Sequence, residues 1–143
     1  MKFQPLLLGA LIIGFTPQVQ SHSASAVLGG DASNSALAHV TCLNDGTGEP
    51  AALISQIKDM SQPDEGLLLS VQLLKGTQVI NSTDSISGDA NYSPLVALEG
   101  GAGVYNMMLT KTAEGERTFD LIWHCMTADG LHTGTDIVVR QYK

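Results

Sequence analysis

The chain has 143 residues and a formal net charge of −7, with 7 Lys and Arg against 14 Asp and Glu. This length suits one domain and not two. Because no basic stripe offsets the acidic balance, the composition argues against nucleic acid or an anionic membrane surface as a partner.

The first element along the chain has the features of a secretory signal peptide. Lys2 precedes a short apolar run, Leu6 to Phe15, whereas a helix that spans a bilayer needs about 20 apolar residues. Small residues then offer two cleavage points. We expect a signal peptide over residues 1–26, with cleavage after residue 21 as the alternative, and a single domain over residues 27–143. The protein is then periplasmic or secreted, in a bacterium, and does not insert into the membrane after cleavage.

Four segments of the exported part are predicted to contain strands, because short apolar stretches alternate with polar residues and turns separate them. The second segment also fits a helical stripe, and we favour a strand because both neighbouring segments are strands. The third segment is expected to be a hairpin that turns at Lys75-Gly76. The four segments are residues 36–43, 51–60, 66–83 and 93–103.

The last forty residues show the clearest alternation and predict strand, turn, strand, turn, strand. One face of the middle strand is bulky and apolar, so we expect this face to lie toward the core. A turn centred on Glu114 should pair the preceding strand with this one, with Leu109 opposite Phe119 and Tyr105 opposite Trp123. The predicted core residues of the middle strand are Phe119, Leu121, Trp123 and Cys125.

The final turn is predicted to keep the same face toward the core. Ile137 and Val139 of the last strand are apolar and should lie on the core side with Trp123. A two-residue Asp-Gly turn would place them on the opposite side, because side chains alternate along a strand. We therefore expect a three-residue loop, Asp129-Gly130-Leu131.

Cys42 and Cys125 are the two cysteines of the chain, and both lie in the part predicted to be exported. An oxidising compartment favours their pairing. The alternative, two free thiols that bind a metal, lacks the close spacing typical of such sites. We predict a disulfide between them, which stabilises the fold by about 4 kcal/mol in the chain-entropy description.

Several short strands with a long-range cysteine pair predict an all-β fold, an immunoglobulin-like antiparallel β-sandwich with one disulfide. The chain has no Trp in its middle third, and Trp123 stands where an antibody domain carries the Tyr two residues before its second Cys. The prediction is therefore the shared architecture and not an antibody-type domain.

The motifs of common catalytic sites are missing from the sequence. There is no GxSxG, no HExxH, and no Cys-His pair with a free thiol once the disulfide forms. We expect that the protein is not an enzyme.

Metal binding is the sharper hypothesis for the C-terminal region, where His and Met residues gather. Thioether sulfur favours Cu(I), and imidazole binds both oxidation states of copper, so copper is the expected cofactor. The candidate ligands are His132, His124, Asp136, Met126 and His22.

The expected register of the final hairpin limits which ligands can share one ion. If Ala128 lies opposite His132, then His124 lies opposite Asp136, and the two histidines are four residues apart along the hairpin. At 3.3 Å per residue this is about 13 Å, too far for one copper ion. We therefore expect that His124 and His132 do not chelate together. A cross-strand ion pair or hydrogen bond between His124 and Asp136 is the plainer interpretation.

The segment from Phe119 to Val139 resembles the C-terminal hairpin of CopC-type periplasmic copper-binding proteins. That hairpin has an aromatic residue, alternating apolar residues, a Trp, a Ser/Thr-x-Asp-Gly-His turn, a Gly and a final strand. The match covers about 21 of the 143 residues. The matching positions are Phe119, Trp123, Thr127, Asp129, Gly130 and Gly134.

The resemblance implies export, an immunoglobulin-like sandwich and a Cu(II) site made of the mature N-terminal His, an Asp and the turn His. Cleavage before His22 would supply the first ligand. His132 would stand for the turn His, one residue later than in the family pattern. Cys42 and Cys125 are not part of that pattern.

The alternative function is a protein-interaction or assembly module without metal, which resembles chaperones or pilins. The partner would be another periplasmic or secreted protein. Pilin subunits look similar near the C-terminus, with a Gly fourteenth from the end and a penultimate Tyr142. Their apolar stripe would, however, require apolar residues where Asp136 and Arg140 stand. A sheet face or edge can bind a partner without any motif.

Overall fold

A computed structural model describes residues 22–143. Its regular structure consists of strands, and within these residues no helix has the length and apolarity needed to cross a membrane. Residues 1–21 of the predicted signal peptide lie outside the described residues. The strands are β1 (Ser23–Leu28), β2 (Ala36–Leu43), β3 (Pro50–Asp59), β4 (Leu69–Lys75), β5 (Gln78–Asp84), β6 (Val96–Leu98), β7 (Gly103–Lys111), β8 (Arg117–Thr127) and β9 (His132–Tyr142).

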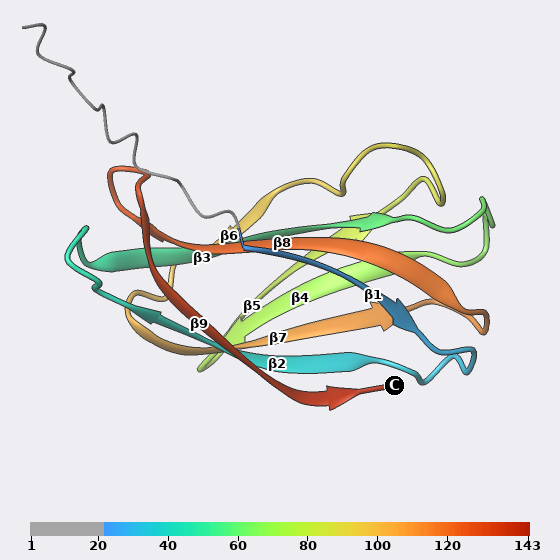
Figure 1. Cartoon of the computed structure of the whole chain (residues 1–143), viewed down its shortest axis with the longest axis horizontal. Helices are drawn as coiled ribbons and strands as arrows, with labels where there is room; N and C mark the ends of the chain where they lie inside the picture. The colour runs from blue at the N-terminus through green and yellow to red at the C-terminus, as the bar shows by residue number, and fades with distance from the viewer. Residues whose placement is uncertain (1–21) are drawn as a thin grey trace, which may run out of the picture.

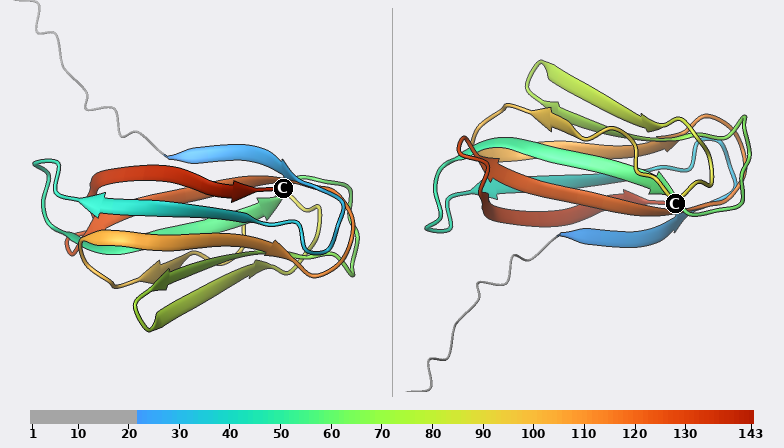
Figure 2. Two further views of the ribbon diagram at one scale, coloured as in Figure 1. Left: turned by 90° about the horizontal axis from the view of Figure 1, so that it is seen from below. Right: turned by 90° about the horizontal axis from the view of Figure 1, so that it is seen from above.

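The strands form two antiparallel layers that are joined by β9. One layer has the order β1-β8-β3-β6, and the other has the order β5-β4-β7-β2-β9. At its start β9 pairs with β8 through His132 and Thr133, and from Gly134 onward it pairs with β2. The sheet therefore nearly closes into a barrel (Figures 1 and 2). β1 pairs with residues 117–122 of β8, a part of that strand with which β9 does not pair.

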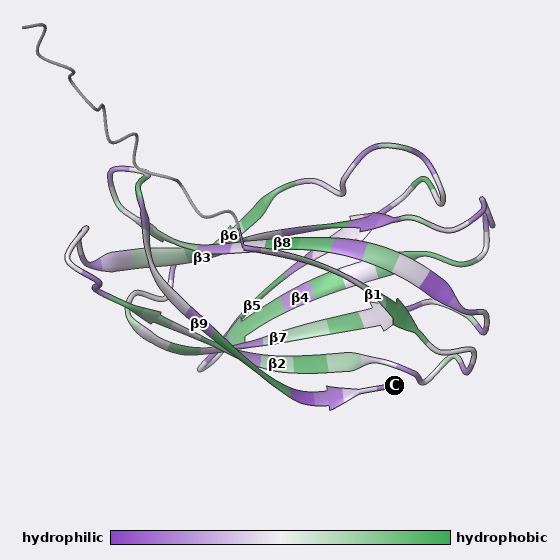
Figure 3. Cartoon of the chain, in the orientation of Figure 1, coloured by the Kyte–Doolittle hydropathy of each residue, from purple (hydrophilic) through white to green (hydrophobic). Residues whose placement is uncertain are grey.

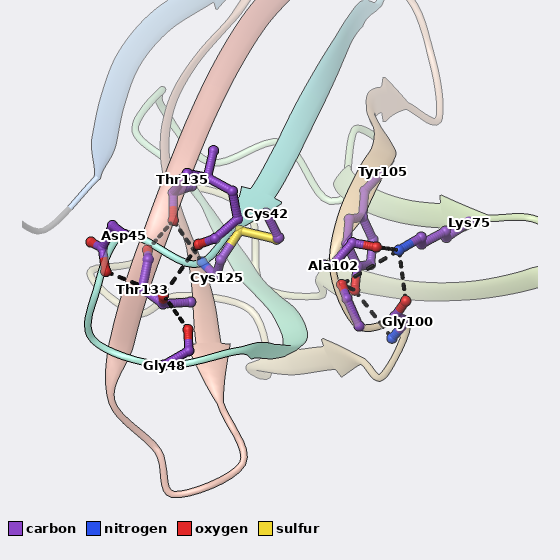
Figure 4. The surroundings of a disulfide bond; sticks show 12 residues. Cys42, Asp45, Gly48, Lys75, Gly100, Ala102, Tyr105, Cys125, Thr133 and Thr135 are labelled. Carbon is purple, nitrogen blue, oxygen red and sulfur yellow. Dashed lines mark hydrogen bonds between the residues drawn. A yellow bond between two sulfur atoms is a disulfide. The ribbon is translucent and has the colours of Figure 1, made fainter.

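The change of partner along β9 depends on close packing at its first residues. A Cβ at Gly134 would lie 2.7 Å from the carbonyl oxygen of Leu43, so glycine alone lets β9 pass this close to β2. The Thr133 hydroxyl donates to the Gly48 carbonyl at 2.8 Å, and the Cys125 amide donates to the Thr135 hydroxyl at 3.0 Å. These bonds fix the point where β9 crosses between the layers (Figure 4).

The disulfide between Cys42 of β2 and Cys125 of β8 confirms the predicted pairing. It joins the two layers across the core, and both cysteines are fully buried. Figure 4 shows it beside the two threonines of β9.

The expected strands are present in the first two thirds of the chain. Residues 51–60 form a strand and not a helix, and the hairpin of β4 and β5 turns at Gly76, with Lys75 opposite Gln78. Gly76 has a φ of 59°, a conformation that glycine adopts readily. Alternation also gives the correct buried face, as Figure 3 shows by the apolar segments along the inner strands. The fully or nearly fully buried residues include Val40, Leu53, Ile57, Leu73, Tyr105, Leu109, Phe119, Leu121 and Trp123.

The predicted hairpin between the strands before and after Glu114 is wrong. β7 pairs with β2 and β4, while β8 pairs with β1, β3 and β9. The turn at Glu114 instead carries the chain from one layer to the other. Alternation places Leu109 and Phe119 on the core side in both arrangements, so it cannot separate strands that lie side by side from strands that face each other.

A buried ionic cluster lies at the start of β8. Arg117 binds Asp59 of β3 through Nη2 at 2.6 Å and Nε at 3.0 Å, and both side chains are almost fully buried. Ser87 donates to the same carboxylate at 2.9 Å, and Arg117 also donates to the Gln62 carbonyl at 2.7 Å. The charges are thus paired and hydrogen-bonded, which a buried ion pair requires.

Candidate functional site

The turn between β8 and β9 decides which histidines meet. It is a three-residue loop as predicted, but it lies one residue earlier, over residues 128–130. The Thr127 amide donates to the Leu131 carbonyl at 2.8 Å, and Gly130 takes a φ of 80°. His132 therefore lies opposite Met126 and not opposite Ala128.

This shift brings His132 next to His124, so the expected separation of about 13 Å is wrong. The two residues form a diagonal cross-strand pair, a position within reach of aromatic rings. Their rings stack with centroids 4.3 Å apart and planes inclined by 17°. A loop that starts one residue earlier moves the register by two residues, which is enough to join the two candidates.

His22 completes the group from the start of the described chain. The Trp123 amide donates to the His22 carbonyl at 3.2 Å, which extends the pairing of β1 with β8. The His22 amide nitrogen lies 3.4 Å from Nδ1 of His124, and the His22 ring centroid is 5.7 Å from that of His124. We call His22, His124 and His132 the histidine cluster.

The histidine cluster is largely shielded from solvent and incompletely hydrogen-bonded. His124 is 5% exposed. Nδ1 of His22 and Nδ1 of His132 are buried and have no hydrogen-bond partner within the described residues. Burial, followed by the charges of His132 and His22, lowers the pKa of His124 from 6.5 to about 4. Its imidazole is therefore neutral near pH 7, which is the form that binds a metal.

Of the two remaining predicted ligands, Met126 lies beside the histidine cluster and Asp136 lies away from it. Asp136 lies opposite Thr41 of β2, because β9 has already left β8, so the predicted pairing of His124 with Asp136 is wrong. Met126 lies directly opposite His132 and next to the cluster. The structure thus brings together three of the five candidates, with Met126 beside them and Asp136 exposed on the other layer.

The cluster is not a preformed set of converging ligands. Across residues 22–143, no three His, Cys, Asp or Glu side chains are already arranged around one ion position. His124 and His132 stack and do not point toward a common centre. Rotation of the rings about their side-chain bonds would be needed before their nitrogens could share a metal.

An apolar groove of about 320 Å³ lies between β1 and β9, beside the histidine cluster. Its lining includes Trp123, whose ring centroid is 6.1 Å from that of His22. Ala24 and Ala26 of β1 face Ile137 and Val139 of β9 across it. Sequence reasoning missed the groove, because the two alanines reveal an unfilled space only after β1 and β9 are known to flank it.

Comparison with family models, with curated proteins and with solved structures gives no significant match over this chain.

Proposed function

We propose that this protein is an exported, non-catalytic β-sandwich of immunoglobulin-like kind that binds copper through the histidine cluster and passes it on in the periplasm. The observation that carries the proposal is the contact of three imidazoles, two of which have buried Nδ1 atoms with no hydrogen-bond partner among residues 22–143. Buried polar atoms are nearly always satisfied in native proteins. A metal ion would satisfy both atoms with the ligand type that copper favours.

Cleavage of the signal peptide after residue 21 would add a further nitrogen ligand to the same site. It would make the His22 nitrogen a free amine, 3.4 Å from Nδ1 of His124. Two nitrogens that each lie about 2 Å from one metal are separated by at most about 4 Å, so the observed spacing fits. Cleavage after residue 26 would remove His22 and four residues of β1, which pairs with β8. We therefore favour the earlier boundary.

The remaining ligand differs from the one that the CopC-type resemblance implies. Asp136 pairs with β2 and is left out of the proposed site. Met126, opposite His132, offers a thioether in its place. A site of imidazoles with one thioether binds Cu(I) as well as Cu(II).

The test is a copper titration of the mature protein that starts at His22. Trp123 is the only Trp and lies close to His22, so bound Cu(II) should quench its fluorescence. We expect saturation at one equivalent, and a loss of affinity of at least about tenfold for His132→Ala or His124→Gln. His39→Ala is the matched control, because His39 lies on the outward face of β2, opposite Val138.

Two results would contradict the proposal. One is the absence of saturable quenching by Cu(II) and of any calorimetric signal with Cu(I). The other is an exported chain that begins at Val27, which N-terminal sequencing would reveal, because this chain would lack His22.

The alternative function is a metal-free module that binds another periplasmic or secreted protein. The observation in its favour is the apolar groove between β1 and β9, since apolar hollows on a protein surface are common binding sites. A wild type that binds no copper in the titration would favour this alternative.

A further inference from the structure

The outer edge of β9 is left without a strand partner. From Gly134 onward β9 pairs with β2 along one edge, while β8 contacts only its first two residues. Within residues 22–143 no other strand pairs with the remaining edge. In Figure 1 this part of β9 forms the lower border of the molecule, and in the left view of Figure 2 it lies between β1 and β2.

The middle of this free edge is apolar on both faces. Ile137 and Val139 face the groove with exposed fractions of 36% and 61%, and Val138 on the opposite face is 54% exposed. Figure 3 shows a hydrophobic segment of β9, in green, with hydrophilic segments, in purple, on either side of it. Proteins usually protect an exposed edge with charged side chains, proline or a β-bulge, and residues 137–139 of β9 have none of these.

The other long edge of the same layer, β5, is different. Its exposed residues are Gln78, Val79 and Asn81, so a single large apolar side chain stands among polar ones. β5 therefore resembles an ordinary edge strand that faces water, and β9 does not.

The charges that flank the apolar segment are arranged symmetrically. Asp136 lies two residues before Val138, and Arg140 lies two residues after it. Both are exposed, and neither takes part in an ion pair within the described part of the chain. An antiparallel pair of such strands centred on Val138 would place each Asp136 opposite Arg140 of the other copy. Opposite charges in this position stabilise a strand pair.

We propose that two copies of this chain form a homodimer through the free edges of β9, with the twofold axis at Val138. A twofold axis normal to the sheet keeps the same face inward in both copies, so Ile137 of one copy meets Val139 of the other. The two five-stranded layers then form one continuous sheet. In the pairing of β9 with β2, Val139 lies opposite Ala38 and Gln141 opposite Leu37, so Arg140 is the extra residue of an irregularity. The regular contact therefore ends at Arg140 and covers about five residues per copy. This proposal does not depend on the copper site.

The experiment measures the mass of the mature protein by sedimentation equilibrium over a range of concentrations, with a chelator present. We expect a reversible dimer for the wild type. Asp136→Arg and Arg140→Asp each place like charges opposite one another, so each should weaken the dimer by about tenfold or more. Val79→Lys, at a similarly exposed position on the β5 edge, is the control and should leave the dimer unchanged.

Mixing the two single variants gives the decisive result. In a heterodimer of Asp136→Arg with Arg140→Asp, every flanking pair is again of opposite charge, so the equimolar mixture should regain the wild-type association. The double variant should also dimerise with itself. A wild type that stays monomeric at about 100 µM overturns the proposal. So does a dimer that both single variants leave intact, or a mixture that shows no recovery.

Discussion

Two buried polar groups lie near opposite ends of β8, and they differ in how well their atoms are satisfied. Arg117 at the start of the strand is paired with Asp59 and surrounded by further hydrogen-bond partners. Near the other end, the histidine cluster contains two buried nitrogens without a partner in the described chain. A fully satisfied polar network stabilises one structure, whereas an unsatisfied one has binding capacity left. The difference separates a structural group from a candidate site.

The two groups also differ in charge balance. Asp59 and Arg117 carry opposite charges at a distance of 2.6 Å. The histidine cluster has no acid among its three members, so protonation of one ring opposes protonation of the next. This repulsion, added to burial, lowers the pKa of His124 to about 4. The neutral form of His124 is therefore the favoured one near pH 7.

The largest effect is expected from breaking the satisfied group. Arg117→Leu leaves the buried carboxylate of Asp59 without its cation, and should lower the free energy of unfolding by about 3–5 kcal/mol. Urea denaturation followed by circular dichroism measures it. The double variant Asp59→Asn, Arg117→Leu should recover part of the loss. A loss below about 1 kcal/mol for the single variant would show that the pair is not the structural group described here.

A smaller effect is expected from lowering the pH on the metal-free protein. The pKa of His124 is about 4 in the folded state against 6.5 for an unperturbed histidine. The unfolded chain therefore takes up the proton first as the pH falls. The free energy of unfolding should decrease between pH 6.5 and about pH 4, and this contribution should stop changing below that range. Urea denaturation at stepped pH checks it.

His124→Gln is the control for the pH series, since it removes the titrating group and should flatten this part of the profile. An identical slope in the variant and the wild type would assign the dependence to other groups.

The smallest effect is expected from His132→Ala without metal. Its Nδ1 has no hydrogen bond to lose within residues 22–143, so the variant should change the free energy of unfolding by less than about 1 kcal/mol. With copper present, the wild type should unfold at a higher temperature than His132→Ala, because a ligand raises the stability of the protein that binds it. Thermal unfolding with and without Cu(II) measures this gain. The same gain in both proteins would exclude His132 as a ligand.

Much of the fold followed from patterns within single segments. Alternation identified β2, β3 and the hairpin of β4 and β5, and it placed Trp123 and Cys125 on the core side. The pairing of Cys42 with Cys125 followed from having two cysteines and an expected export signal. The sequence pattern could not predict that the turn at Glu114 connects the two layers. The alternation of β7 and β8 is the same whether the two strands are neighbours in one sheet or face each other across the core.

The candidate site was predicted as a set of residues but not as an arrangement. His22, His124 and His132 were all candidates. The expected loop was one residue too late, however, and it separated the last two by four positions. Hydrogen bonds from Thr127 and the conformation of Gly130 set the actual register. A turn of this kind is chosen by small local energies, and a shift of one residue moves side chains by several ångströms.

Local pattern was therefore enough for the positions and buried faces of most strands, because these depend on the order of polar and apolar residues along the chain. It did not predict β1, most of which was assigned to the signal peptide. The partner of each strand, the crossing of β9 between the layers and the meeting of three histidines depend on contacts between distant segments. Ile137 and Val139 illustrate both: alternation gave their inward direction, but their exposure arises because β1 opposes them with alanines and leaves a groove. Such a fit depends on the shapes of both surfaces, and no single segment contains that information.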